Sequence, residues 1–187
     1  MSEEAAQARR QQRLEALCGA AVRALSGEPG LQFRGGRLHR GRQALPLWAP
    51  HLHPDLAGDD DASFRGAADG LALRLRASDA ALHQRLSPAR PLQRLLFDLL
   101  EQLRVESLAP AHWPGVPRNL RRRFHDWSRA FQGAGLADSA RGILLFTVAQ
   151  MARARVLAEP VPEDAEDLIE ATRAALAPAL GPMLVGL

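Results

Sequence analysis

Apolar residues recur at intervals of three and four through most of this 187-residue chain. Such spacing places side chains on one face of an α-helix, which turns by about 100° per residue. The longest run extends from Ser63 to Leu86, where one apolar face carries Phe64, Ala68, Leu71, Leu75, Leu82 and Leu86. Because similar runs recur between proline and glycine breaks, the sequence predicts an all-α fold.

Six helices are predicted from these runs and from their flanking residues. Prolines such as Pro91 suit the first turn of a helix, and glycines such as Gly133 commonly follow the last turn. The predicted helices cover approximately residues 3–25, 63–86, 91–103, 116–131, 139–154 and 162–178. With 47% hydrophobic residues the chain can bury a substantial core. We therefore expect a single helical domain over residues 1–187.

The helical period disappears between residues 31 and 48. Leu31 and Phe33 alternate with polar residues, as do Leu45 and Leu47 with small or cyclic ones, and Gly35-Gly36 offers a turn. Alternation around a glycine pair is typical of a β-hairpin. The segment is predicted to form a small hairpin or two extended pieces.

All 24 basic residues are arginine, because the sequence contains no lysine. A Walker A loop, a Schiff-base nucleophile and a pyridoxal attachment site all require lysine. The sequence therefore excludes these chemistries from this chain, and we expect neither catalytic residues nor a cofactor. The pI near 10.6 reflects arginine without lysine or tyrosine, since the formal charge is only +3.

The single Cys18 lies in an apolar helical pattern. A lone cysteine cannot form an internal disulfide, so a buried and unreactive thiol in a reducing compartment is expected. The charged first residues do not resemble a signal peptide, and no apolar stretch is long enough for a membrane span. We expect a cytoplasmic protein without a membrane partner.

A polar stripe is predicted beside the apolar face of the helix at 63–86. Its members fall within about 40° of one line at helical rotation, and they are Arg65, Asp69, Arg76, Asp79 and His83. A stripe in that position faces either a neighbouring helix or a groove.

Glu101 is flanked by Phe97 and Val105 four residues away, so its carboxylate should be partly buried. A buried carboxylate needs a partner, which Arg104 or an arginine of the stripe would supply. An internal polar network between two helices, formed by the stripe together with Glu101, Arg104 and Glu106, is the favoured interpretation. A surface for binding a partner protein is the alternative.

His83, Glu101 and Glu106 are possible metal ligands, since histidine and carboxylates are acceptable ligands. Glu101 and Glu106 are five residues apart and should face different sides of their helix, and no HExxH motif is present. His51 and His53 are better explained as members of a proline-flanked surface loop. We therefore expect no metal site.

The densest basic cluster lies on the predicted helix at 116–131 and comprises Arg118, Arg121, Arg122 and Arg123. Phe124, Trp127 and Phe131 are spaced to face the core. Without an exposed aromatic platform, a solvated face is favoured over an acidic partner, and nucleic-acid binding is not expected.

An ordered series of segments resembles the N-terminal region of the T subunit of the aerobic cobaltochelatase. The residues that carry this resemblance are Arg65-Gly66-Ala67-Ala68-Asp69-Gly70-Leu71-Ala72-Leu73-Arg74-Leu75-Arg76, Asp79, His83, Pro88, Leu96-Phe97-Asp98-Leu99-Leu100-Glu101-Gln102-Leu103-Arg104-Val105-Glu106 and Gly115-Val116-Pro117-Arg118-Asn119-Leu120. Ser78 stands where the family's usual His-Asp pair would place histidine.

The resemblance implies a subunit that works with a hexameric AAA+ ATPase and a large chelatase subunit to insert cobalt into a corrin precursor. Family members also carry a von Willebrand A domain with a DxSxS motif, which is not found in these 187 residues. The expected function is a non-catalytic assembly or adaptor domain in such a complex. A nucleic-acid or regulatory binding module and a relic of a metal-dependent hydrolase are the alternatives.

Overall fold

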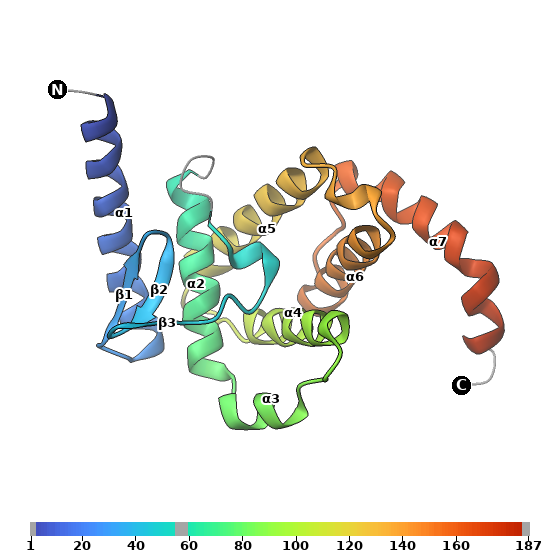
Figure 1. Cartoon of the computed structure of the whole chain (residues 1–187), viewed down its shortest axis with the longest axis horizontal. Helices are drawn as coiled ribbons and strands as arrows, with labels where there is room; N and C mark the ends of the chain where they lie inside the picture. The colour runs from blue at the N-terminus through green and yellow to red at the C-terminus, as the bar shows by residue number, and fades with distance from the viewer. Residues whose placement is uncertain (1–2, 55–59, 185–187) are drawn as a thin grey trace. The chain divides into compact units, whose positions relative to one another are not determined.

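The computed structural model describes residues 3–54 and 60–184, and helices dominate it (Figure 1). Seven α-helices and one three-stranded sheet lie within these residues, which confirms the predicted helical class. The chain divides into two compact units, with unit 1 ending at Trp127 and unit 2 beginning at Ser128. The boundary falls inside helix α5 (Gly115–Gly133).

Unit 1 holds the sheet and most of the helices. Before α5 its elements are α1 (Glu3–Ser26), β1 (Leu31–Arg34), β2 (Arg37–Arg40), β3 (Gln43–Ala44), the 3-10 helix η1 (Pro50–Leu52), α2 (Asp61–Ala77), α3 (Ala80–Leu86) and α4 (Pro91–Ser107). Unit 2 holds the 3-10 helix η2 (Leu136–Asp138), α6 (Ala140–Leu157) and α7 (Glu163–Leu184).

The sheet is an antiparallel meander in the order β1-β2-β3. Phe33 pairs with Leu38, and the turn between these strands contains Gly35 and Gly36 at φ values of 56° and 73°. Two consecutive residues with positive φ give the tight turn that matches the twist of a hairpin. The predicted hairpin is therefore confirmed, although its ladder ends at Ala44 rather than Trp48.

Helix α2 lies at the centre of unit 1, in contact with α1, α4 and η1. Its buried residues include Phe64, Leu71 and Leu73. Phe64 also meets Phe33 of β1 edge to face at 5.3 Å between ring centroids. Gly66 and Gly70 allow neighbouring segments to approach α2 closely. A Cβ on Gly70 would lie 2.6 Å from the Leu52 side chain.

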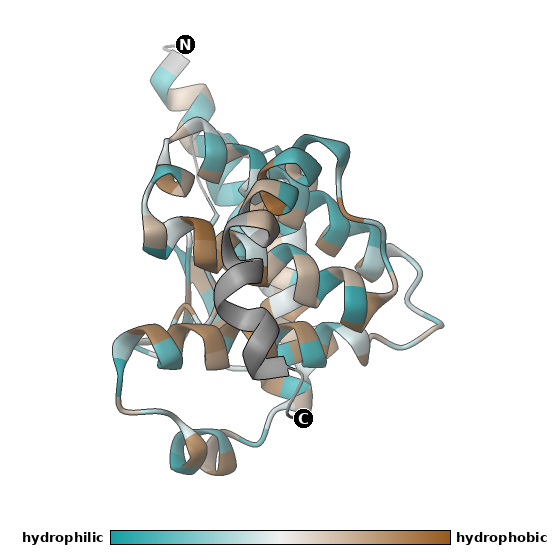
Figure 2. Cartoon of the chain, turned by 90° about the vertical axis from the view of Figure 1, so that its right-hand side faces the viewer, coloured by the Kyte–Doolittle hydropathy of each residue, from teal (hydrophilic) through white to brown (hydrophobic). Residues whose placement is uncertain are grey.

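The predicted helix at 63–86 is wrong in one respect, because it is broken into α2 and α3. Ser78 adopts an extended conformation after the last turn of α2. The Asp79 side chain then caps α3 by accepting a hydrogen bond from Leu82 N–H. None of the residues of α3 is buried, and Figure 2 shows apolar residues on this lowest helix. Leu82 and Leu86 are thus exposed instead of belonging to the core.

Unit 2 packs α6 against α7. Phe146 and Ala149 of α6 and Ala165 of α7 are fully buried. Gln150 donates a 2.7 Å hydrogen bond to Ser128 Oγ, which joins α6 to the end of α5. Helix α7 continues to Leu184, past the predicted end near residue 178. Pro178 lies inside this helix, so the predicted end there is wrong.

Candidate functional site

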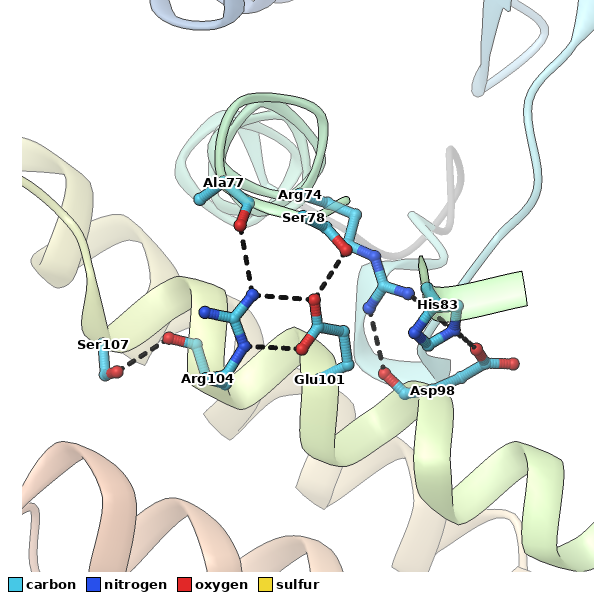
Figure 3. Close-up of polar contacts among 8 residues, drawn as sticks. All are labelled: Arg74, Ala77, Ser78, His83, Asp98, Glu101, Arg104 and Ser107. Atoms are coloured by element: carbon cyan, nitrogen blue, oxygen red, sulfur yellow. Dashed lines mark hydrogen bonds and ion pairs between the residues drawn. The ribbon is translucent and has the colours of Figure 1, made fainter. Parts of the chain in front are cut away.

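The Glu101 carboxylate joins the end of α2 to α4 (Figure 3). Ser78 Oγ donates to Glu101 Oε1 at 2.6 Å, and Arg104 Nε donates to Oε2 at 2.6 Å. Arg104 also donates from Nη2 to the Ala77 carbonyl at 3.1 Å. The predicted pairing of Glu101 with Arg104 is therefore present, and it also satisfies a carbonyl at the C-terminal end of α2.

The hydrogen bond from Arg104 holds the pKa of Glu101 at about 2, against an ordinary value of 4.5. Burial opposes this shift, while Ser78 and the charge of Arg74 add to it. Hydrogen bonds to the charged form of a carboxyl favour ionisation. The Glu101 carboxyl of the folded protein therefore stays ionised at every pH at which the same carboxyl is ionised in the unfolded chain.

Glu101→Gln is expected to lower the free energy of unfolding at pH 7 by roughly 1 to 2 kcal/mol, because solvent screens this partly exposed pair. The folded pKa is depressed, so the Glu101 contribution is complete above 4.5 and is lost as the pH falls towards 2. Urea denaturation of both proteins from pH 7 to about pH 3 measures this. The difference in free energy of unfolding between the two proteins should shrink as the pH falls. Glu4→Gln, on the exposed part of α1, should show no such pH-dependent difference. A pH-independent difference would contradict the assignment.

A second polar cluster lies one turn away and links α2, α3 and α4 (Figure 3). His83 Nε2 lies 2.6 Å from Asp98 Oδ1, and Arg74 Nη1 donates to the Asp98 carbonyl at 3.3 Å. The Arg74 side chain is only 3% exposed, and the pKa of Arg74 is lowered by burial against the opposing charges of Glu101 and Asp98. The His83 ring stacks on Phe97 at 4.5 Å. His83 is thus the residue that ties α3 to α4.

Asp69 occupies a buried position between α2 and α5. Its Oδ1 accepts from Arg65 Nε at 2.7 Å, and its Oδ2 accepts from Asn119 Nδ2 at 2.8 Å. Burial raises the pKa of Asp69, while these two hydrogen bonds and the Arg65 charge lower it. Because the Asp69 side chain is fully buried, it is not available to a partner protein in this conformation.

The predicted stripe does not form one continuous line. Arg76 points to α1, where it donates to the Leu25 carbonyl at 3.1 Å, and it lies over the Trp113 ring at 5.2 Å. Asp79 belongs to the cap of α3. Asp79 and His83 leave the predicted line because the break at Ser78 ends the 100° rotation on which the alignment depended. Residues of the stripe therefore meet three different neighbours.

Glu106 of the predicted polar network lies in a buried site, and its partner there, His51, was not revealed by the sequence. His51 Nε2 lies 2.8 Å from Glu106 Oε1, which also accepts from Gln102 Nε2 at 3.0 Å. The His51 and Glu106 side chains are 1% and 0% exposed, so the predicted surface loop at His51 is wrong. Pro50 starts η1, which turns His51 inward. No spacing in the sequence relates residues that are so far apart along the chain.

Arg123 is also buried rather than solvated, which corrects its assignment to an exposed basic face. Its guanidinium donates to the His51 carbonyl at 2.6 Å, to Ser63 Oγ at 2.9 Å and to the His53 carbonyl at 3.0 Å. Burying a guanidinium requires such a set of acceptors. Arg123 lies next to the core position Phe124, which is the one sequence signal that could have indicated this.

Comparison with known protein families gives a match over residues 8–187 to the family described as cobalamin biosynthesis protein CobT. The chain belongs to this family. The match extends well beyond residues 65–120, which carried the sequence resemblance, and the family description assigns its members to cobalamin biosynthesis. No solved structure matches the chain.

In this CobT-family chain, Arg118, Arg121 and Arg122 lie exposed on α5, on the side away from the buried Leu120 and Phe124. Arg122 pairs with Asp126 at 2.9 Å and with Asp60 at 3.0 Å. The hydrogen bond to Asp126 raises the pKa of Arg122. These three residues are called the α5 basic face below.

Cys18 of this CobT-family chain is buried at 2% exposure, and burial raises the pKa of its thiol to about 12. A thiol with so high a pKa is a poor nucleophile. The described residues contain no group of three or more histidine, cysteine or acidic side chains placed to hold a metal ion. None of their helices combines the length and apolarity needed to cross a bilayer.

Proposed function

We propose that this chain is a non-catalytic assembly domain of a cobaltochelatase-like complex, working beside a AAA+ ATPase and a large chelatase subunit in the cytoplasm. The observation that carries the proposal is the match to the CobT family over residues 8–187. A sequence without lysine cannot build a Walker A loop. The energy of nucleotide hydrolysis would therefore come from the partner.

The contacts of three carboxylates in unit 1 support a scaffold role. Asp69, Glu101 and Glu106 each accept hydrogen bonds from neighbouring side chains inside unit 1. A general base must reach a proton of its substrate, and carboxylates engaged in this way hold helices together instead. This arrangement favours assembly over the alternative of a relic hydrolase.

The α5 basic face is the surface that we propose for the ATPase partner. Arg118 and Arg121 are exposed and lie at helical spacing on one side of α5. Arginine is favoured where a carboxylate must be bound with defined geometry. Phe124 and Trp127 are buried beneath this face, so it offers no stacking platform for single-stranded nucleic acid.

Reversing both charges in Arg118→Glu/Arg121→Glu is expected to weaken binding to the cognate AAA+ ring at least tenfold, or about 1.4 kcal/mol. Calorimetric titration of the full chain with the assembled ring measures this. Arg34→Glu/Arg42→Glu changes the net charge equally at two exposed residues of the hairpin region and should bind like the original chain. Both variants alter exposed sites, so their stability should change by less than about 0.5 kcal/mol.

Equal binding by the two double variants would remove the α5 basic face from the interface. If the original chain also fails to bind the ring, the assembly role itself is contradicted. Submicromolar binding of nucleic acid at physiological salt, lost in Arg118→Glu/Arg121→Glu, would favour the nucleic-acid module instead.

A further inference from the structure

A pocket of about 770 Å³ opens in unit 1 between the hairpin region, the end of α2, α3 and α4. Small-molecule sites commonly have volumes of roughly 300 to 1,000 Å³. Neither the contacts of Glu101 nor the α5 basic face accounts for this pocket. Its lining nevertheless divides into an apolar side and a charged side.

The apolar side comes from the segment that follows β3. Leu45 and Trp48 line the pocket together with Leu75 of α2. Trp48 is half-buried, and the Arg74 guanidinium lies over its ring at 5.5 Å from the centroid. A flat apolar group could therefore rest against Trp48 while remaining within reach of a cation.

The charged side has more cations than its own carboxylates neutralise. Glu28 and Asp98 are the acids of the lining, and they face Arg40, Arg74 and Arg94. Glu28 Oε2 forms an ion pair with Arg40 Nη2 at 2.7 Å. Arg74 lies beside Asp98 and also within the influence of the Glu101 charge, which comes from outside the lining.

Asp98 is shared between Arg74 and His83. His83 Nε2 lies 2.6 Å from Asp98 Oδ1, while Arg74 Nη2 is 3.9 Å from the same oxygen. A carboxylate only accepts, so the proton lies on His83 Nε2, and this nitrogen cannot accept from Arg74 Nη2 at 3.0 Å. Two donor groups thus face each other beside one acceptor.

Arg94 adds a further positive charge at the pocket. The hydrogen bonds that the structure gives it go to the backbone carbonyls of Pro88 and Ala89, at 3.1 and 3.4 Å. Its charge has no carboxylate partner among the contacts found for the described residues. An anionic group in the pocket would give Arg94 the carboxylate partner that these contacts do not provide.

We propose that this pocket binds a carboxylate joined to a flat apolar body. The carboxylate would accept hydrogen bonds from the exposed Arg94, and the apolar body would pack on Trp48 and Leu45. The proposal is independent of the assembly role, because it uses none of the α5 basic face.

A matched pair of probes tests the charge requirement on the full chain. The probes are 1-naphthoate and its neutral analogue 1-naphthamide, titrated while the indole N–H resonance of Trp48 is followed by NMR, with Trp48→Phe used to assign that resonance. We expect 1-naphthoate to bind at least tenfold more tightly than the amide, which corresponds to about 1.4 kcal/mol. Equal binding of the two probes, or no change at Trp48 with either, would overturn the proposal.

Two variants distinguish binding in the pocket from non-specific attraction to the charge of the surface. Arg94→Gln should weaken binding of 1-naphthoate by about fivefold or more and leave 1-naphthamide unchanged, since only the ionic contact is lost. Arg85→Gln alters an exposed arginine of α3 that does not line the pocket and should have no effect. Equal losses in both variants would reduce the effect to non-specific charge and overturn the site.

A second arm identifies the source of the carboxylate. The peptides N-acetyl-Phe-Asp-amide and N-acetyl-Phe-Asn-amide present the same apolar body with and without the charge. Tighter binding of the Asp peptide than of 1-naphthoate would support the site and assign it to a protein segment. Tighter binding of 1-naphthoate would support it as a site for a small organic acid.

Discussion

Gly66→Ala is expected to lower the free energy of unfolding by about 3 kcal/mol, the upper range for overpacking a buried contact. A Cβ at Gly66 would collide with the carbonyl oxygen of Asn119 and would lie 2.6 Å from the Cβ of Arg123. Both atoms belong to the α5 side of the contact and neither is the tip of a flexible side chain. The helices α2 and α5 would have to separate.

Urea denaturation measures the change, with Gly30→Ala as the matched control. A Cβ at Gly30 meets nothing within 4 Å, so that variant should change stability by less than about 0.5 kcal/mol. Equal stabilities of the two variants would show that the close approach of α2 and α5 is not maintained in solution.

Glu106→Ala is expected to lower the free energy of unfolding by about 3 to 5 kcal/mol, because each buried donor that loses its acceptor costs about 1 to 3 kcal/mol. The substitution deprives His51 Nε2 and Gln102 Nε2 of their shared acceptor in a place from which water is excluded. Loss of the side chain also leaves a cavity beside η1 and α2. Chemical denaturation at neutral pH measures the loss.

Glu106→Gln should be less damaging than Glu106→Ala, because its amide oxygen can still accept while its size is kept. A double-mutant cycle with His51→Ala isolates the coupling between the two residues. We expect Glu106→Ala to cost much less in the His51→Ala background, since the partner is already gone. Independent, additive losses would contradict a direct interaction between His51 and Glu106.

Local spacing explains what could be predicted of this site. Glu101 and Arg104 lie three residues apart on one helix, and that spacing alone brings their side chains together. The hairpin likewise depends on Gly35 and Gly36, which adopt the positive φ that other residues avoid. In both cases the interacting residues are close in sequence.

Contacts between distant segments could not be predicted. His51 meets Glu106 and Arg123 meets Ser63, and no local periodicity relates either pair. Arg123 was predicted to be exposed because it follows Arg121 and Arg122, and these two neighbours are indeed exposed. Its burial depends on carbonyl acceptors from η1, whose position only the packing of α2 and α5 provides.

By itself the sequence determined the helical class, the hairpin and the resemblance to the cobaltochelatase T subunit, because helix period, glycine turns and ordered motifs are properties of neighbouring residues. Only the tertiary structure decided where the helix at 63–86 breaks and which polar side chains are buried. Ser78 and Asp79 can continue a helix or end one. The hydrogen bond from Ser78 to Glu101 and the attachment of His83 to Asp98 favour the break, and both partners come from α4.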